Sequence, residues 1–173
     1  MLVLTKIQKQ YGKNAVLREI NLQAANGSCV GILGGNGGGK TTLLSVLGGI
    51  LRPDGGGFTY DGEELFGHEA RRRALVSFSP QANPLMEELS GFDNLLLWHD
   101  RKAIERGMAE DGAIAALGAT AFLKKPVAKL SGGMKKRLAL SIAVLRAPKI
   151  LLLDEPTAAL DMEGKAKFYA YLK

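Results

Sequence analysis

The chain has 173 residues, of which 46% are hydrophobic and 23% charged, and its formal net charge is +6. This composition is typical of one folded domain and excludes a chain that is disordered as a whole. The longest apolar runs, such as residues 150–153, are far shorter than the roughly 20 residues of a membrane-spanning helix. The first residues lack the basic leader and long apolar core of a secretory signal. The single cysteine, Cys29, excludes an internal disulfide.

Short strands and glycine-rich turns dominate the first half of the sequence. Alternating apolar residues predict strands over residues 2–9 and 16–23, joined by a turn at residues 11–14. The apolar run of residues 28–33 predicts a third, buried strand, and leucines at helical spacing predict a helix over residues 40–50. Further strands are predicted over residues 58–62 and 74–79.

Helical patterns take over in the second half. Residues 84–129 are the best candidate for an inserted helical subdomain, with expected core positions at Leu95, Leu96, Leu97, Ile104, Ile114 and Leu117. A helix over residues 131–146, a buried strand over residues 150–153 and a helix over residues 163–172 follow. Strands that alternate with helices predict an α/β fold with a mainly parallel sheet.

The strongest motif is Gly34-x-x-x-x-Gly39-Lys40-Thr41, between a predicted strand and a predicted helix. Glycines let backbone N–H groups approach phosphates at a helix N-terminus, whose dipole favours anions. The motif therefore predicts a P-loop that binds a nucleoside triphosphate. Lys40 would reach the β and γ phosphates, and the Thr41 hydroxyl would ligate Mg²⁺.

A second motif is the apolar run that ends in Asp154-Glu155. A carboxylate at the end of a buried strand can face the Mg²⁺ of a P-loop, so Asp154 is a candidate metal ligand. Glu155 is placed to orient or deprotonate an attacking water. The alternative reading is a strand cap followed by a solvated acid.

A third motif is Leu130-Ser131-Gly132-Gly133. Ser131 is a good helix N-cap, and the two glycines expose N–H groups at a positive helix end. An ordinary capped helix is the alternative. A second anion-binding helix end makes sense where two chains enclose the nucleotide between them.

These motifs, with Gln81 between them and Ala159-Leu160-Asp161 after them, resemble the ATP-binding cassette (ABC) ATPase family along essentially the whole chain. The resemblance implies a P-loop NTPase fold: a mainly parallel sheet core, a small antiparallel β part and an inserted helical subdomain. It divides the single domain 1–173 into a core of residues 1–83 and 130–173 and a helical subdomain of residues 84–129.

The resemblance also implies roles for particular residues. Glu155, Gln81 and Lys40 would be catalytic, and Thr41, Gln81 and Asp154 would hold Mg²⁺. Tyr11 would stack on adenine, although it could simply close a strand turn, and Gln81 could be a polar loop residue. The remaining contacts to ATP would come from Gly34, Gly35, Asn36, Gly37, Gly38, Gly39, Thr42, Ser131, Gly132, Gly133 and Asp161, those from Ser131 onward facing the nucleotide of a partner chain.

Several positions depart from the family pattern. Gly35 and Gly38 stand where proline and alanine or serine are usual, and Met134 replaces the signature glutamine. The sequence ends at Lys173, before the strand and switch histidine with which family members continue, so we expect the 173-residue form to bind ATP and hydrolyse it poorly. His68 and His99 are expected at the surface, as is the Arg71–Arg73 run.

The function that the resemblance implies is that of the ATPase subunit of an ABC membrane transporter. It would use ATP and Mg²⁺, pair with a second ABC ATPase domain, and lie on the cytoplasmic face of the membrane against separate transmembrane permease subunits, with no nucleic-acid partner. A soluble ABC ATPase of assembly or repair is one alternative, and a hydrolysis-deficient ATP-binding partner is another. The sequence leaves open the cargo, the direction of transport, and whether the dimer is of like or unlike chains.

Overall fold

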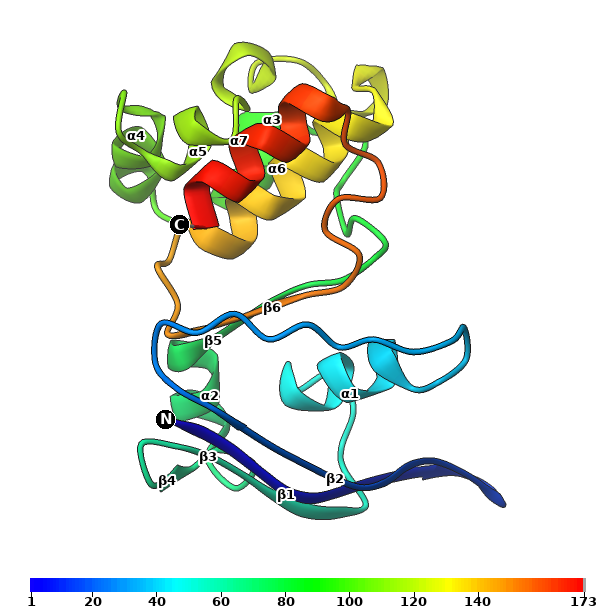
Figure 1. The fold of residues 1–173 in the computed structure, drawn as a ribbon. Coiled ribbons are helices and arrows are strands. Elements are labelled where there is room, and N and C mark those ends of the chain that lie inside the picture. The colour runs from blue at the N-terminus through cyan, green and yellow to red at the C-terminus, as the bar shows by residue number, and fades with distance from the viewer. Residues whose placement is uncertain (173) are drawn as a thin grey trace. The chain divides into compact units, whose positions relative to one another are not determined.

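The computed structural model describes residues 1–172, which form two compact units, one of Met1–Phe78 and one that begins at Ser79. The elements are shown in Figure 1. The first unit contains β1 (Leu2–Tyr11), β2 (Asn14–Ala24), α1 (Lys40–Leu47), β3 (Gly55–Tyr60), β4 (Glu63–Glu64), α2 (Glu69–Leu75) and the start of β5 (Val76–Ser79). The second contains α3 (Gly91–Leu96), α4 (Arg101–Met108), α5 (Ala113–Ala116), η1 (Thr120–Phe122), η2 (Val127–Lys129), α6 (Gly132–Val144), β6 (Ile150–Leu153) and α7 (Met162–Leu172).

A four-stranded antiparallel sheet organises the first unit, with strand order β2-β1-β3-β4. Leu4 of β1 lies opposite Leu22 of β2 and Phe58 of β3. Leu4, Ile7 and Phe58 are buried. Leu4 and Ile7 are three residues apart on β1, so strict alternation would place them on opposite faces. The register shift between them, where Lys6 adopts a φ of 48°, allows both to be buried. The predicted first two strands and the turn between them are confirmed, and the sheet is the expected antiparallel β part.

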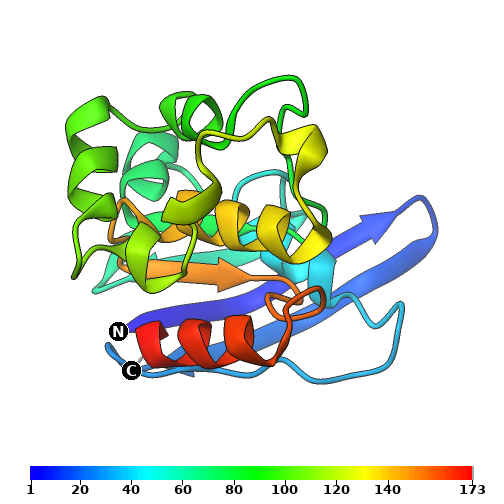
Figure 2. The same cartoon turned by 90° about the horizontal axis from the view of Figure 1, so that it is seen from above.

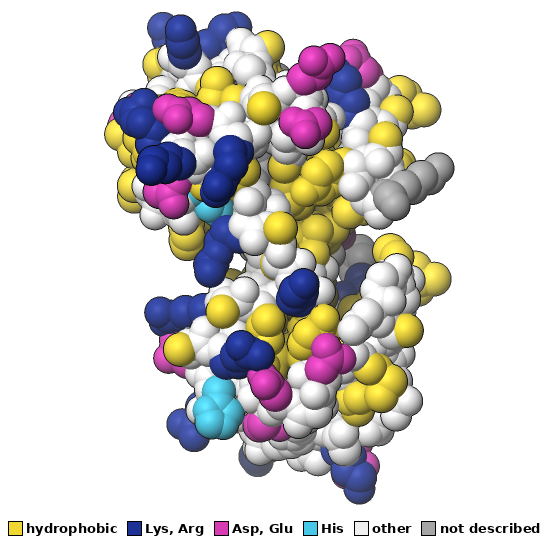
Figure 3. All heavy atoms as spheres, turned by 90° about the vertical axis from the view of Figure 1, so that its left-hand side faces the viewer, with side chains coloured by type: hydrophobic (Ala, Val, Ile, Leu, Met, Phe, Trp, Pro, Cys, Tyr) yellow, Lys and Arg dark blue, Asp and Glu magenta, His cyan; other side chains and the backbone are white. Residues whose placement is uncertain are grey.

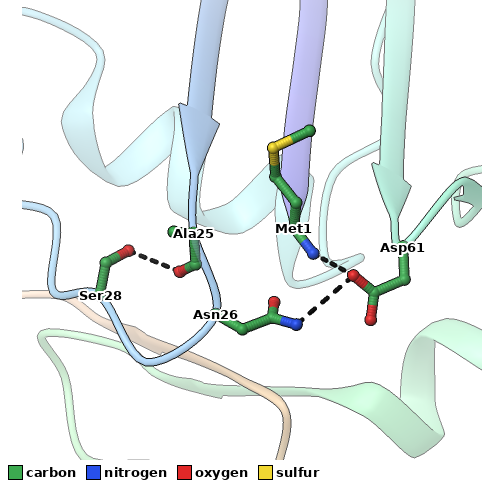
Figure 4. Close-up of polar contacts among 5 residues, drawn as sticks. All are labelled: Met1, Ala25, Asn26, Ser28 and Asp61. Carbon is green, nitrogen blue, oxygen red and sulfur yellow. Dashed lines mark hydrogen bonds and ion pairs between the residues drawn. The ribbon is translucent and has the colours of Figure 1, made fainter.

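The prediction of a strand over Ser28–Leu33 is wrong for this structure. Within residues 1–172 this segment joins no strand ladder, and Leu33 is 94% exposed. After β2 the chain turns at Ala25–Ser28, where the Ser28 hydroxyl donates to the Ala25 carbonyl at 2.7 Å. Asn26 and the Met1 amino group both bond Asp61 (Figure 4). An apolar run forms a strand only where a neighbouring strand pairs its backbone.

Two predicted boundaries in the first unit differ from the structure: the end of α1 and the start of β5. α1 ends at Leu47, earlier than expected, because Gly48 and Gly49 follow and Gly49 adopts a φ of 82°. α2 extends to Leu75, so the predicted strand over residues 74–79 begins two residues late, at Val76. Within the Arg71–Arg73 run on α2, the first and third arginines are exposed as expected and pair with Glu63 and Glu69.

In the second unit, side chains of α6 contribute to two hydrophobic clusters. One cluster includes Leu138 of α6 with Leu95 of α3 and Ile104 of α4. The other joins Leu140 and Val144 of α6 to Phe168 of α7. Figure 2 accordingly shows α6 between α7 and the helices α3 and α4. The predicted helices before and after the buried strand Ile150–Leu153 are confirmed to within a few residues.

The prediction of core positions is wrong for two leucines. Leu95 is buried, whereas Leu96 and Leu97 are exposed. Successive residues of a helix point about 100° apart, so three consecutive leucines cannot all face one core. Figure 3 shows the side of the molecule that lies on the left in Figure 1, where Lys and Arg side chains border hydrophobic side chains.

Candidate nucleotide site

The P-loop lies in the first unit, between β2 and α1. α1 begins at Lys40, immediately after the glycine-rich loop, as predicted. Gly37 and Gly39 adopt left-handed φ values of 77° and 84°, and the Gly38 amide donates to the Gly35 carbonyl at 3.2 Å. Gly34 to Gly38 are all exposed. The loop therefore presents a turn of accessible backbone at a helix N-terminus, which is the arrangement that binds phosphates.

Gly39 is fixed by its surroundings as well as by its φ. A Cβ atom at this position would lie 3.0 Å from side-chain carbons of both Val16 and Leu17 on β2. Only glycine accepts both the left-handed backbone and this close approach. The packing of α1 against β2 thus sets the place where the loop enters the helix.

Lys40 is tethered within the loop. Its Nζ donates to the carbonyl oxygens of Gly34 at 2.8 Å and Gly35 at 2.9 Å. The next residue, Thr41, is exposed, and Thr42 is half-buried. The ammonium therefore sits over the loop, where it can exchange carbonyl partners for phosphate oxygens.

Tyr11 is the last residue of β1 and is 49% exposed. The Lys9 ammonium lies 5.8 Å from the centre of its ring. The ring is accessible for stacking, and its role with adenine stays a prediction.

The two acidic residues of the second motif, Asp154 and Glu155, lie in the second unit. The Asp154 amide at the end of β6 donates to the Ser79 carbonyl at 3.0 Å. The Asp154 side chain is 5% exposed, and its Oδ2 atom has no hydrogen-bond partner within residues 1–172. A buried carboxylate is paired with a positive group or coordinates a metal ion, so the free Oδ2 atom makes Asp154 a candidate ligand for a hard cation.

Glu155 and Gln81 meet in this unit. The Gln81 Nε2 donates to the Glu155 Oε2 at 3.0 Å, although 74 residues separate the two along the chain. Both side chains are exposed, and Glu155 adopts a φ of 46°, which is uncommon for a residue with a Cβ. The turn after β6 therefore directs Glu155 toward the segment that follows β5.

The signature segment caps α6. The Ser131 Oγ accepts the Met134 amide at 3.3 Å, which is the N-cap bond that the sequence predicts. A Cβ at Gly133 would lie 3.0 Å from the Ala159 carbonyl oxygen, whereas Gly132 has open space around it. Asp161 in turn caps α7, because its Oδ1 accepts the Gly164 amide at 2.8 Å.

One residue near this site was not predicted from the sequence. Lys136 on α6 is only 2% exposed, and its Nζ donates to the Pro80 carbonyl at 3.3 Å. Burial lowers the pKa of Lys136, while the charges of Asp154 and Glu155 act to raise it. The signal that could have found Lys136 is its spacing of four residues from Leu140, which places it on a buried face of the helix.

The two histidines differ in exposure. His68 is exposed, as predicted, but His99 is half-buried, with Nε2 at 3.0 Å from the Ile142 carbonyl oxygen. Burial lowers the pKa of His99. Within residues 1–172 no group of three His, Cys, Asp or Glu side chains could hold a metal ion by itself. No helix there has the length and apolar character that a membrane crossing needs.

The sequence also matches known proteins. The family model described as ABC transporter matches residues 17–158. Nod factor export ATP-binding protein I of Cupriavidus pinatubonensis is 34% identical over 100% of this chain and 54% of its own length. Linearmycin resistance ATP-binding protein LnrL of Bacillus subtilis is 31% identical over 95% of this chain and 54% of its own length. The chain thus spans about half the length of these relatives.

Solved structures agree. A dimeric structure of the bacterial ABC transporter cassette MJ0796 has a TM-score of 0.86 at 25% identity, covering 99% of this chain and 81% of that one. An ATP-binding subunit of an ABC transporter has the same TM-score, 0.86, at 23% identity, covering 98% of this chain and 72% of that one. The expected α/β P-loop NTPase fold is confirmed by this likeness. The chain belongs to the ABC transporter family and has the fold of its ATP-binding cassettes.

Proposed function

We propose that this chain binds and hydrolyses ATP and thereby powers an ABC membrane transporter. The observation that carries the proposal is the Gln81–Glu155 hydrogen bond of 3.0 Å directly after the buried Asp154. A carboxylate for the attacking water next to a carboxylate for the metal is the arrangement that phosphoryl transfer to water needs. The P-loop would supply the phosphate-binding backbone.

ATP would be held mainly by the glycine-rich loop. The exposed N–H groups of residues 34–39 and the N-terminus of α1 favour the β and γ phosphates. Lys40 would leave the Gly34 and Gly35 carbonyls and donate to phosphate oxygens, adding charge-assisted hydrogen bonds. Tyr11 and Thr42 would complete this half, with the tyrosine ring against adenine.

The residues also fit Mg²⁺. Among residues 1–172, Asp154 has a buried carboxylate oxygen without a hydrogen-bond partner, and the other two expected ligands, Thr41 and Gln81, have exposed side chains with an oxygen atom. Oxygen donors of this kind are those that Mg²⁺ prefers, together with phosphate oxygens and water. When bound, the ion neutralises charge that develops on the phosphates.

Hydrolysis would depend on Glu155. In the structure its carboxylate accepts a hydrogen bond from Gln81, so the amide holds the carboxylate in one direction. Glu155 would accept a hydrogen bond from the attacking water and withdraw its proton as the γ-phosphoryl group is transferred. Gln81 would then report the state of the nucleotide to the segment that follows it.

The remaining residues would act on the nucleotide of a second ATPase domain. Ser131, Gly132 and Gly133 lie at the N-terminus of α6, a second anion-binding helix end. Asp161 would link the two sites across the dimer. The dimeric form of the cassette MJ0796 supports this part of the proposal.

Transmembrane permease subunits would be separate partners, and the chain would lie peripherally on the cytoplasmic face of the membrane. Relatives support a role in transport by their printed names, which include Nod factor export and sulfate/thiosulfate import. Because both exporters and importers occur among them, the proposal commits to no direction or cargo.

Replacing Glu155 by glutamine tests the proposal. The full-length protein should hydrolyse ATP in the presence of Mg²⁺, and Glu155→Gln should lower kcat by about 100-fold or more, since a positioned base contributes about that much. ATP binding should remain, because the P-loop is unchanged. Glu163→Gln, at an exposed carboxylate on α7, is the matched control and should keep the wild-type rate. Equal rates for the two variants would overturn the role of Glu155.

A further inference from the structure

Lys136 is the one basic side chain buried within residues 1–172. It lies on α6, the helix that begins at the Ser131-Gly132-Gly133 segment. Neighbouring Lys135 differs, because it is partly exposed and pairs with Glu87 at 2.6 Å. An ammonium group is rarely buried without compensation, since it loses its hydration. The burial of Lys136 therefore needs a reason.

Lys136 is connected to the proposed catalytic residues through two hydrogen bonds. Its Nζ donates to the carbonyl oxygen of Pro80 at 3.3 Å. Pro80 is followed by Gln81, whose amide donates to Glu155 at 3.0 Å. The backbone of a proline has no N–H and can only accept a hydrogen bond, through its carbonyl oxygen. By bonding this oxygen, the ammonium of Lys136 holds the backbone directly before Gln81.

The charges around Lys136 fit the same arrangement. The carboxylates of Asp154 and Glu155 both attract the ammonium, which offsets part of the cost of its burial. Asp154 is itself only 5% exposed, so a nearby positive charge also helps to keep this carboxylate buried. Lys136 thus carries a buried positive charge on which both Asp154 and Glu155 act.

We propose that Lys136 is a positioning residue for ATP hydrolysis, which holds the Pro80 carbonyl so that the Gln81 amide meets the Glu155 carboxylate. The inference rests on the proposed function, in which Glu155 acts on the attacking water. Lys136 touches neither nucleotide nor water in this account. Its loss should slow the chemical step and leave ATP binding unchanged.

The test compares Lys136→Gln with Lys135→Gln in the full-length protein. A glutamine amide ends one bond short of the lysine nitrogen, so it cannot reach the Pro80 carbonyl, whereas an arginine can. Lys136→Gln should lower kcat by about tenfold, a loss of about 1.4 kcal/mol of transition-state stabilisation. The KM for ATP should stay within about twofold, because substrate binding is unaffected. Lys135→Gln should match the wild type, and Lys136→Arg should recover most of the rate.

Hydrogen exchange of the peptide that covers residues 79–89, in nucleotide-free protein, gives a second reading. Exchange in this peptide should be faster in Lys136→Gln than in Lys135→Gln. Should Lys136→Gln not fold, Lys136→Met takes its place, because it brings no unpaired polar group into the buried site. Lys136→Arg as slow as Lys136→Gln, equal kcat for the two glutamine variants, or a parallel change of kcat and KM would each overturn the proposal.

The two proposals fail in different ways. If the wild-type protein does not hydrolyse ATP, or if Glu155→Gln is as active as the wild type, the proposed function is wrong and the hydrolytic role of Lys136 falls with it. If Glu155→Gln is inactive while Lys136→Gln is fully active with unchanged exchange, only the inference about Lys136 is overturned.

Discussion

At the scale of single residues, the P-loop depends on backbone conformations that a side chain disfavours. Gly37 and Gly39 both have a left-handed φ, but a Cβ at Gly37 meets nothing within 4 Å, whereas one at Gly39 meets Val16 and Leu17 at 3.0 Å. The two positions therefore separate the cost of the backbone conformation from the cost of a clash.

Alanine at each of these glycines should have different effects on stability. Gly37→Ala should lower the free energy of unfolding by about 1–2 kcal/mol, the cost of a left-handed residue with a Cβ. Gly39→Ala should lower it by about 3 kcal/mol or more, since overpacking against β2 adds to that cost. Denaturant unfolding of the two variants checks this, and equal losses would contradict the role given to the contact with β2.

The local structure of the candidate site could be predicted from the sequence, because helix starts and caps depend on residues close together in the chain. The P-loop glycines precede the helix that Lys40 begins, and Ser131 caps the helix that follows it. Lys136 could not be predicted in this way. A lysine in a helix is usually solvated, and its burial against the Pro80 carbonyl depends on a contact 56 residues distant in the sequence.

At the scale of elements, α6 begins at two glycines that differ in their surroundings. Gly133 faces the Ala159 carbonyl, and Gly132 faces open space. The start of α6 and the segment before α7 therefore lie close together at Gly133. This approach brings the signature segment near the loop that carries Asp161.

Alanine at these two glycines should have opposite effects. Gly132→Ala should raise the free energy of unfolding by about 0.5 kcal/mol, because alanine restricts the unfolded chain and favours a helix. Gly133→Ala should lower it by about 1–2 kcal/mol, since its Cβ presses on a backbone oxygen. Thermal unfolding of the two variants measures the difference. A Gly133→Ala variant as stable as Gly132→Ala would show that the loop before α7 moves freely away.

Elements with strong local patterns were predicted well. β1, β2, β6, α6 and α7 each lie within a few residues of their expected bounds. The strand expected over Ser28–Leu33 was not, because its formation depends on pairing with other strands and not on its own apolar run. Leu96 and Leu97 were misplaced for a related reason, since composition alone does not say which side of a helix is covered.

At the scale of the whole molecule, the account requires two copies of the ATPase domain, or two related domains, around shared ATP. In the proposed function, the P-loop before α1 binds one ATP, and the N-terminus of α6 faces the ATP held by the partner domain. A single nucleotide does not need both helix ends from one chain, so the proposal assigns the second one to the ATP of a partner domain. The dimeric cassette structure with a TM-score of 0.86 is the fold-level precedent.

The most direct test is the mass of the full-length Glu155→Gln protein with and without ATP and Mg²⁺, measured by light scattering during size-exclusion chromatography. Because this variant should bind ATP without hydrolysing it, the account predicts a monomer without nucleotide and a dimer with it. Glu155→Gln combined with Ser131→Arg, which places a bulky side chain at the second anion site, should stay monomeric. An ATP-bound Glu155→Gln protein whose mass does not change would contradict the account.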